Sequence, residues 1–190
     1  MSTQAEIEAL EAQIQELKGR LSKALAEREV EPVADYEFLT ENGAVRLSEL
    51  FGEHDDLLVV HNMGQSCSYC TLWADGFIGL YPQIKARCAF VLVSPDVPSV
   101  QAKIKAERSW PFPMVSDKEK VFTTQMGYLK DGNSFWPGVS AFHKQADGSM
   151  VRTNQAVFGP GDDYCAVWPF LDLLKDQADG WEPSNANRLF

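Results

Sequence analysis

The chain has 190 residues, 45% of them hydrophobic, which is enough for one globular domain of ordinary size with a short appendage. Its formal net charge of −10 argues against nucleic acid or an anionic membrane as a partner, because both select a basic surface. No apolar run approaches the roughly 18 residues of a membrane span, and the N-terminus is polar and acidic, unlike a signal peptide. We therefore expect a cytoplasmic protein.

Residues 2–29 predict a long helix, since they are rich in good helix formers and Pro32 stops the pattern. The apolar positions of this stretch follow a 3-4 spacing: Ile7, Leu10, Ile14, Leu17, Leu21 and Ala24. So narrow an a/d seam is typical of a coiled coil. We expect a homodimer through residues 2–29, with packing against the chain's own domain as the alternative.

The next segment predicts a β-hairpin. Residues 36–40 alternate along a strand, Asn42-Gly43 is a strong turn sequence, and Val45 to Leu47 supplies the return strand.

Residues 57–81 are the stretch around which the chain is organised. Leu57 to Val60 is a short apolar run, as in a buried strand, and a polar loop with Cys67 and Cys70 follows. The bulky residues after the loop recur on one helical face: Tyr69, Trp73, Phe77 and Leu80. The two cysteines therefore fall in the first turn of a helix, with Pro82 expected either to end that helix or to kink it.

Two cysteines three apart in a first turn share a face and can form a disulfide. The positive end of the helix dipole favours a thiolate, so we expect a lowered pKa at Cys67 and redox chemistry at the pair. Half of a zinc site and an inert pair are the alternatives. The first would need a second Cys or His pair, and His61, Cys88, His143 and Cys165 stand singly, so we expect neither metal nor cofactor.

The second half alternates strands and helices. Cys88 to Ser94 is an apolar run typical of a strand buried on both faces, and a helix ending near Arg108 and a short strand at Met114-Val115 follow. A helix is expected over Lys118 to Met126, and Val139 to His143 forms a hairpin with the segment from Met150.

A last helix is expected after residues 159–161, capped by Asp162 or Asp163. Its inner face would consist of Val167, Phe170, Leu171 and Leu174. Cys165 is expected to be structural. Regular structure is expected to end at Gly180, and Asn185 to Phe190 to form a mobile tail, with docking of Trp181 and Phe190 onto the domain as the alternative. This order of elements predicts an α/β layer sandwich with a mixed central sheet and the cysteines at the carboxyl edge of a strand.

Three motifs carry a resemblance to a known superfamily: residues 47–52 (L-S-E-L-F-G), residues 67–75 (C-S-Y-C-T-L-W-A-D) and residues 137–142 (P-G-V-S-A-F). They resemble the thioredoxin superfamily and, within it, a bacterial thioredoxin-like family of unknown function labelled predicted dithiol-disulfide oxidoreductase. The resemblance runs from about Val30 to Leu174. It implies a thioredoxin-like three-layer sandwich over residues 32–180, preceded by the helical segment 1–31 and followed by the tail 181–190.

The resemblance also implies roles for the site residues. Cys67 would be the nucleophile that attacks a protein or small-molecule disulfide, and Cys70 the resolving thiol. His61 stands where thioredoxins keep a buried carboxylate. It is either the base that takes the Cys70 proton or a hydrogen-bonded residue at a strand end with no catalytic task.

The superfamily places a cis-proline opposite the cysteines, and Pro137 is the best-placed candidate, with an ordinary trans turn as the alternative. Trp136 and Tyr69 would then form the rim of the substrate groove, unless either belongs to the core.

Two other functions stay open. A peroxiredoxin-like peroxidase is suggested by residues 110–128, but the peroxidatic pattern needs a Pro seven residues and a Thr or Ser three residues before the cysteine, where Cys67 has Val60 and Gly64. The other is a non-enzymatic redox-sensing adaptor assembled through the N-terminal helix.

Overall fold

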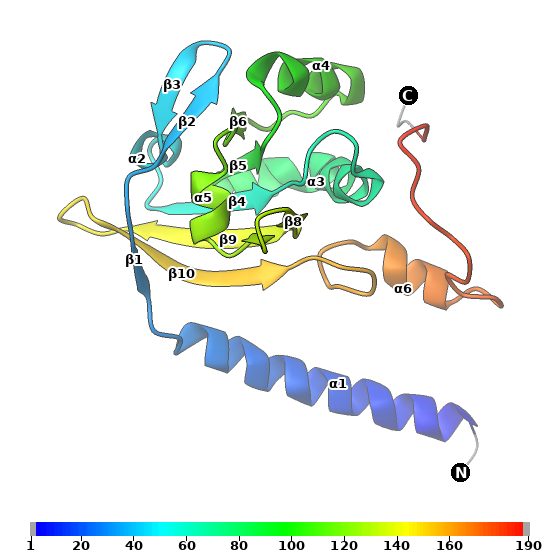
Figure 1. Ribbon diagram of the computed structural model, residues 1–190. Coiled ribbons are helices and arrows are strands. Elements are labelled where there is room, and N and C mark those ends of the chain that lie inside the picture. The colour runs from blue at the N-terminus through cyan, green and yellow to red at the C-terminus, as the bar shows by residue number, and fades with distance from the viewer. Residues whose placement is uncertain (1–2, 188–190) are drawn as a thin grey trace.

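The computed structural model describes residues 3–187 (Figure 1). Positions 1–2, at the start of the expected helix, and 188–190, including Phe190, lie outside the described residues.

Within the described residues, one large mixed sheet forms the middle layer, with the strand order β1-β10-β9-β4-β5-β6-β2-β3. Its strands are β1 (Glu31–Val33), β2 (Glu37–Thr40), β3 (Gly43–Arg46), β4 (Asp56–His61), β5 (Ala89–Ser94), β6 (Met114–Ser116), β9 (Gly138–Lys144) and β10 (Met150–Val157). A separate two-stranded ribbon consists of β7 (Leu129–Lys130) and β8 (Ser134–Phe135). The helices are α1 (Thr3–Ala26), α2 (Leu47–Leu50), α3 (Ser68–Arg87), α4 (Pro98–Arg108), α5 (Val121–Gln125) and α6 (Val167–Asp172).

The centre of the sheet joins a parallel part to an antiparallel part. Strand β4 pairs parallel with β5, and β5 with β6, while β9 runs antiparallel to β4 and forms a hairpin with β10. Helices α3 and α4 make the crossovers between the parallel strands, as such strands require. The predicted mixed α/β sandwich is confirmed. Strand β1, which adds to the edge of β10, was not predicted.

Alternation along β4 divides the core into two layers. Leu57 and Val59 pack on one face, in a cluster with side chains of α2, α5 and β9. Val60 and Leu58 belong to the opposite face, where α3 and α4 cover the sheet. Both layers are rich in aromatic rings, which gives the sheet an apolar environment on each side.

Helix α3 continues through Pro82 as one helix to Arg87, so the expectation that Pro82 ends it is wrong. A proline in a helix removes one backbone hydrogen bond. On both sides of Pro82, side chains still pack on the core, with Tyr81 edge-on to Phe90 and Phe112 and Ile84 in the same cluster. That packing favours the continued helix.

Helix α1 lies apart from the layers, below the β10 side of the sheet in Figure 1. None of its described residues is buried. It touches the body through Leu25, whose carbonyl accepts a hydrogen bond from Asn154 Nδ2 (3.1 Å), and through a 2.7 Å ion pair between Lys18 and Asp163. The helix therefore does not pack against its own domain as a core element, and the expected homodimer stays a prediction.

The expected inner face of the last helix is partly wrong. Helix α6 is short, and Phe170 and Leu174 are 69% and 56% exposed. The burial is provided by Cys165 and Trp168 instead. Neither Asp162 nor Asp163 caps α6, whose N-cap is Ala166 with no side-chain capping hydrogen bond, so the expected cap is wrong. Asp162 instead accepts hydrogen bonds from the backbone N–H groups of Gly159 and Tyr164, in the turn before the helix.

The C-terminal tail is docked in its described part. Trp181 packs edge-on against Trp168, with the ring centroids 5.8 Å apart. The Arg108 guanidinium, 9% exposed, forms a 2.7 Å ion pair with Asp75 and donates to the carbonyls of Asn185 and Asn187.

In the part of the chain that the structure describes, no helix has the length and apolar character that crossing a membrane demands.

Candidate active site

The loop between β4 and α3 is held in one conformation by side chains at its base. Asn62 Oδ1 accepts a hydrogen bond from the Gly64 N–H (2.7 Å), and Asp96, just after β5, accepts one from the Gln65 N–H (2.9 Å). Gly64 has φ +110°, and a Cβ there would lie 3.2 Å from the Asp96 carboxylate. The positive φ strongly favours glycine here, and any larger residue would also have to displace the Asp96 side chain by a few tenths of an ångström.

Cys67 is the N-cap of α3, as the sequence predicts. Its backbone is extended (φ −81°, ψ 104°), and its sulfur accepts the Cys70 N–H at 3.0 Å. The Cys67 carbonyl accepts the Thr71 N–H and the Thr71 hydroxyl, each at 3.1 Å. The thiol sulfur thus takes the place of the side-chain oxygen that caps most helices.

Hydrogen bonds lower the pKa of Cys67 to about 7 from an ordinary value of 9.0. The largest cause is the hydrogen bond from the Cys70 thiol, and the N–H groups of Cys70 and Tyr69 add to it, while partial burial acts in the opposite direction. The pKa of Cys70 is raised for complementary reasons: its proton is held by Cys67, and its side chain is buried. One proton therefore stays on Cys70 while Cys67 ionises.

The two thiols differ in access as well as in acidity. Cys67 is partly exposed, whereas Cys70 is only 3% exposed and its sulfur accepts the Met63 N–H at 3.3 Å. The two sulfurs are not joined by a disulfide. The arrangement has one accessible thiol of lowered pKa with a protonated thiol directly behind it.

His61 lies on the opposite face of the sheet from α3. It shares the face of Val59, and its ring stacks on Tyr128 (centroids 3.8 Å apart) and Phe122 (5.3 Å). Nε2 is 3.0 Å from Ser140 Oγ, and Nδ1 is buried without a partner among the described residues. Burial, followed by the charge of Arg152, lowers the pKa of His61 well below its usual 6.5, so the ring is neutral. Its role as a base stays a prediction; the contacts are those of a packed residue at a strand end.

Pro137 lies beside the end of β4, because the next residue, Gly138, pairs with His61. Among the described residues there is no cis peptide bond, so Trp136–Pro137 is trans and the cis expectation is wrong. The Pro137 carbonyl accepts the Phe158 N–H (2.9 Å), and the Tyr128 hydroxyl donates to the Val139 and Ala156 carbonyls (2.7 and 3.0 Å). These bonds hold the segment in place with a trans peptide.

The two predicted rim residues have different environments. Trp136 is 42% exposed, and the Lys130 ammonium lies 4.6 Å from its ring centroid. Tyr69 is partly buried and packs towards Trp73 and Trp168 (6.1 and 6.3 Å). Only Trp136 thus has the exposure of a groove residue, and the structure groups Tyr69 with the core.

The contacts that support the site were not predicted from the sequence. Asp96 braces the loop, Asp162 accepts the Trp73 indole N–H (3.0 Å), and Tyr128 and Ser140 contact His61 or the strand beside it. A polar residue directly after a buried strand was a usable sign for Asp96, since such residues line the functional edge of α/β sheets. No local pattern singles out Tyr128 or Ser140.

The remaining cysteines have other surroundings. Cys88 and Cys165 are buried, and burial raises the pKa of each thiol. Across residues 3–187, no three His, Cys, Asp or Glu side chains come close enough to hold a metal ion.

Residues 4–179 match a family described as "Bacterial protein of unknown function (DUF899)". The chain belongs to this family. A search of curated proteins returned no match.

Solved structures with the same fold include three bacterial proteins. Peroxidoxin BcpB of Mycobacterium tuberculosis is 25% identical, over 64% of this chain and 80% of its own, with a TM-score of 0.52. The bacterioferritin comigratory protein of Xanthomonas campestris is 16% identical over 64% and 80% (TM-score 0.53). Prx3 of Vibrio vulnificus is 19% identical over 71% and 87% (TM-score 0.55). The family member described here therefore has the thioredoxin-like fold that its motifs imply.

Proposed function

We propose that the protein is a thiol-disulfide oxidoreductase that acts through Cys67 and Cys70. The observation that carries the proposal is the pairing of a partly exposed Cys67, whose pKa is lowered to about 7, with a buried and protonated Cys70. A thiol with a pKa near the ambient pH is the most effective attacker of a disulfide, since it combines a large thiolate fraction with high nucleophilicity.

In the first step the Cys67 thiolate attacks one sulfur of a substrate disulfide. A bond forms between Cys67 Sγ and that sulfur, the substrate S–S bond breaks, and the departing thiolate takes a proton. Once Cys67 is no longer a thiolate, the hydrogen bond that holds the proton on Cys70 is lost. Cys70 then gives up its proton and attacks Cys67 Sγ, which releases the reduced substrate and leaves an intramolecular disulfide.

Trapping tests this order. The Cys70→Ser variant is expected to accumulate a mixed disulfide on Cys67 with a model protein disulfide such as insulin, detected by non-reducing electrophoresis and mass spectrometry. The double variant Cys67→Ser/Cys70→Ser is the control for the buried Cys88 and Cys165. Insulin reduction by that double variant at the rate of the unaltered protein would refute the proposal.

A thiol peroxidase is the second candidate, and one specific observation favours it. Peroxidoxin BcpB, at 25% identity, has the same fold, and the Xanthomonas campestris relative is described by its alkyl peroxide reduction. In a peroxidase the Cys67 thiolate would attack one peroxide oxygen, which breaks the O–O bond, releases the other oxygen as an alcohol or water, and leaves Cys67 as a sulfenic acid. The Cys70 thiol would then condense with that sulfenic acid to give a disulfide and water. Against this stands the missing peroxidatic pattern, with Val60 and Gly64 in place of Pro and Thr or Ser.

Peroxide consumption separates the two enzymes. If hydrogen peroxide is consumed at a rate that requires Cys67 and persists in Cys70→Ser with an added thiol, the peroxidase is favoured. Turnover of disulfides without peroxide consumption favours the oxidoreductase. Binding of a partner with neither turnover would leave the redox-sensing adaptor.

A further inference from the structure

Helix α1 presents an uncovered apolar seam along almost its whole length. Five large side chains of the seam are between 45% and 57% exposed: Ile7, Leu10, Ile14, Leu17 and Leu21. Monomeric proteins seldom expose a continuous apolar stripe, because transferring such side chains out of water is favourable. Nothing in the described part of the chain covers this seam.

The charges of α1 are divided between its two halves. Its first half is acidic and its second half is basic, apart from Glu16 near the middle: Glu6, Glu8 and Glu11 against Lys18, Arg20 and Lys23. A parallel pair of such helices would bring like charges together at both ends. An antiparallel pair brings each acidic half alongside a basic half, so the charge pattern selects the antiparallel arrangement.

We propose that two copies of this chain associate through α1 as an antiparallel two-helix coiled coil. The occupant of the exposed seam is the α1 helix of a second copy, related by a two-fold axis, so that both copies use the same surface. This goes beyond the redox chemistry and does not depend on it.

The apolar spacing also sets the register. When the helices run antiparallel about a centre between Ile14 and Leu17, Ile14 faces Leu17 of the partner and Leu10 faces Leu21 of the partner. Ile7 then faces Ala24 of the partner. Each residue at heptad position a therefore meets a residue at position d of the other helix, as antiparallel knobs-into-holes packing requires. All the seam positions between Ile7 and Ala24 gain a partner in this register.

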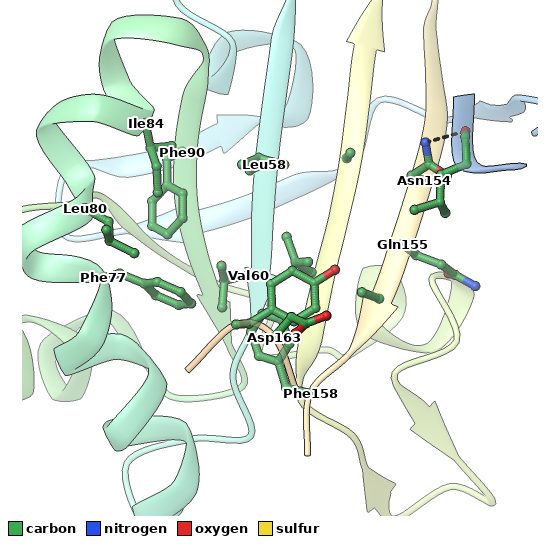
Figure 2. A pocket seen from close by; sticks show the side chains of 15 residues that line it. Leu58, Val60, Phe77, Leu80, Ile84, Phe90, Asn154, Gln155, Phe158 and Asp163 are labelled. Atoms are coloured by element: carbon green, nitrogen blue, oxygen red, sulfur yellow. Dashed lines mark hydrogen bonds between the residues drawn. The ribbon is translucent and has the colours of Figure 1, made fainter. Parts of the chain in front are cut away.

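A neighbouring apolar pocket of about 340 Å³ fits the same arrangement. Figure 2 shows its walls, with Phe77, Leu80 and Ile84 on one side and Asn154 on the other, where the hydrogen bond from Asn154 joins the end of α1. Leu25 of α1 also lines the pocket. In the antiparallel register the first turns of the partner's α1 come alongside this end of the helix. The apolar interface of the coiled coil is therefore continuous with the apolar pocket between α1 and the domain.

Sedimentation equilibrium of the full chain gives the first test. The unaltered protein is expected to be a dimer in the micromolar range. Leu17→Glu should weaken dimerisation by about a hundredfold, because each dimer would bury two unpaired carboxylates. Ala12→Glu is the matched control: it introduces the same charge on the opposite side of the same helix and should leave the dimer intact. A monomeric unaltered protein, or equal weakening by both variants, would overturn the proposal.

Disulfide trapping tests direction and register. In a Cys67→Ser/Cys70→Ser background, the remaining Cys88 and Cys165 are buried. Mild oxidation of a mixture of Leu10→Cys and Leu21→Cys chains is expected to give a cross-linked heterodimer, while each variant alone stays uncross-linked. Cross-linking of Leu10→Cys with itself indicates parallel helices and contradicts the proposal.

Discussion

Cys67 depends for its acidity on one neighbour more than on the helix around it. The hydrogen bond from the Cys70 thiol is the largest cause of the lowered pKa, ahead of the backbone N–H groups of the first turn. The resolving cysteine therefore has two tasks: it activates Cys67 before the reaction and attacks it afterwards.

The rate of alkylation of Cys67 by iodoacetamide is expected to rise with pH through a midpoint of about 7. Below the midpoint the thiol is protonated and slow to react, and above it the thiolate dominates. Cys70→Ala removes the largest cause of the shift, so the midpoint should move to higher pH and the rate at pH 7 should fall several-fold. Mass spectrometry of the Cys67 peptide over pH 5–9 measures both. An unchanged midpoint in Cys70→Ala would contradict the assigned cause.

His61 makes stability depend on pH. Burial lowers its folded-state pKa below the unfolded value of 6.5, so the unfolded chain binds a proton that the folded chain does not. The free energy of unfolding should therefore be highest above pH 6.5 and fall by up to about 1.4 kcal/mol per pH unit below it.

Urea denaturation between pH 5 and 7.5 measures this dependence. His61→Gln keeps a hydrogen-bonding group near Ser140 but does not titrate, so it should remove the slope below pH 6.5. His54→Gln, in the turn before β4, is the control and should retain it. If the free energy of unfolding of His61→Gln still falls below pH 6.5, other titrating groups cause the dependence and the assignment to His61 is wrong.

At the scale of elements, the close approach of three segments holds Pro137 and the end of β9 in place. Tyr128, just before β7, donates hydrogen bonds across to β9 and β10, and its ring lies against Gly138. A Cβ on Gly138 would be 2.3 Å from the Ala156 carbonyl oxygen and from Tyr128 Cε1. The strand beside the candidate site thus has no space for a side chain at this position.

Gly138→Ala is expected to lower the free energy of unfolding by about 1–3 kcal/mol, because backbone and ring would have to shift. Gly79→Ala is a matched control in α3, where a Cβ meets nothing within 4 Å. It should raise the free energy by about 0.5–1 kcal/mol through the helix preference of alanine. Denaturant titration measures the change in the free energy of unfolding for each variant. An unchanged free energy of unfolding in Gly138→Ala would show that the contact relaxes without cost.

At the scale of the whole molecule, α1 and the domain are joined by few contacts. The helix buries none of its described side chains, and its contacts with Asn154 and Asp163 lie outside the loop that carries the cysteines. We therefore expect that removing α1 prevents dimer formation but leaves disulfide reduction by Cys67 and Cys70 intact.

Deletion of residues 1–26 is expected to leave the rate of disulfide reduction per Cys67 within about twofold of the full chain, since ordinary surface changes perturb a domain little. The measurement is turnover of a small aromatic disulfide, with circular dichroism as the control for folding. Loss of turnover in a folded truncated protein would show that α1 contributes to the catalytic site.

Local patterns predicted much of this molecule. The seam of α1, the hairpin at Asn42-Gly43, the buried strands and the position of Cys67 at a helix start all follow from spacing, turn chemistry and capping, which act over a few residues. The fold predicted from the motifs is confirmed as well. Local patterns failed where distant segments compete, as for Pro82, whose helix continues because its neighbours pack on β5 and on Phe112, and for α6, whose expected inner face is exposed.

The sequence by itself determined that two cysteines stand at the start of a helix after a buried strand, and that an apolar seam precedes the domain. Only the tertiary structure decided which way each side chain faces and what surrounds it. His61 is buried in an aromatic stack on the far face of the sheet, Trp136–Pro137 is trans, and Asp96 braces the loop from another strand. These features depend on contacts between residues far apart in the chain, and such contacts leave no periodic trace in the sequence.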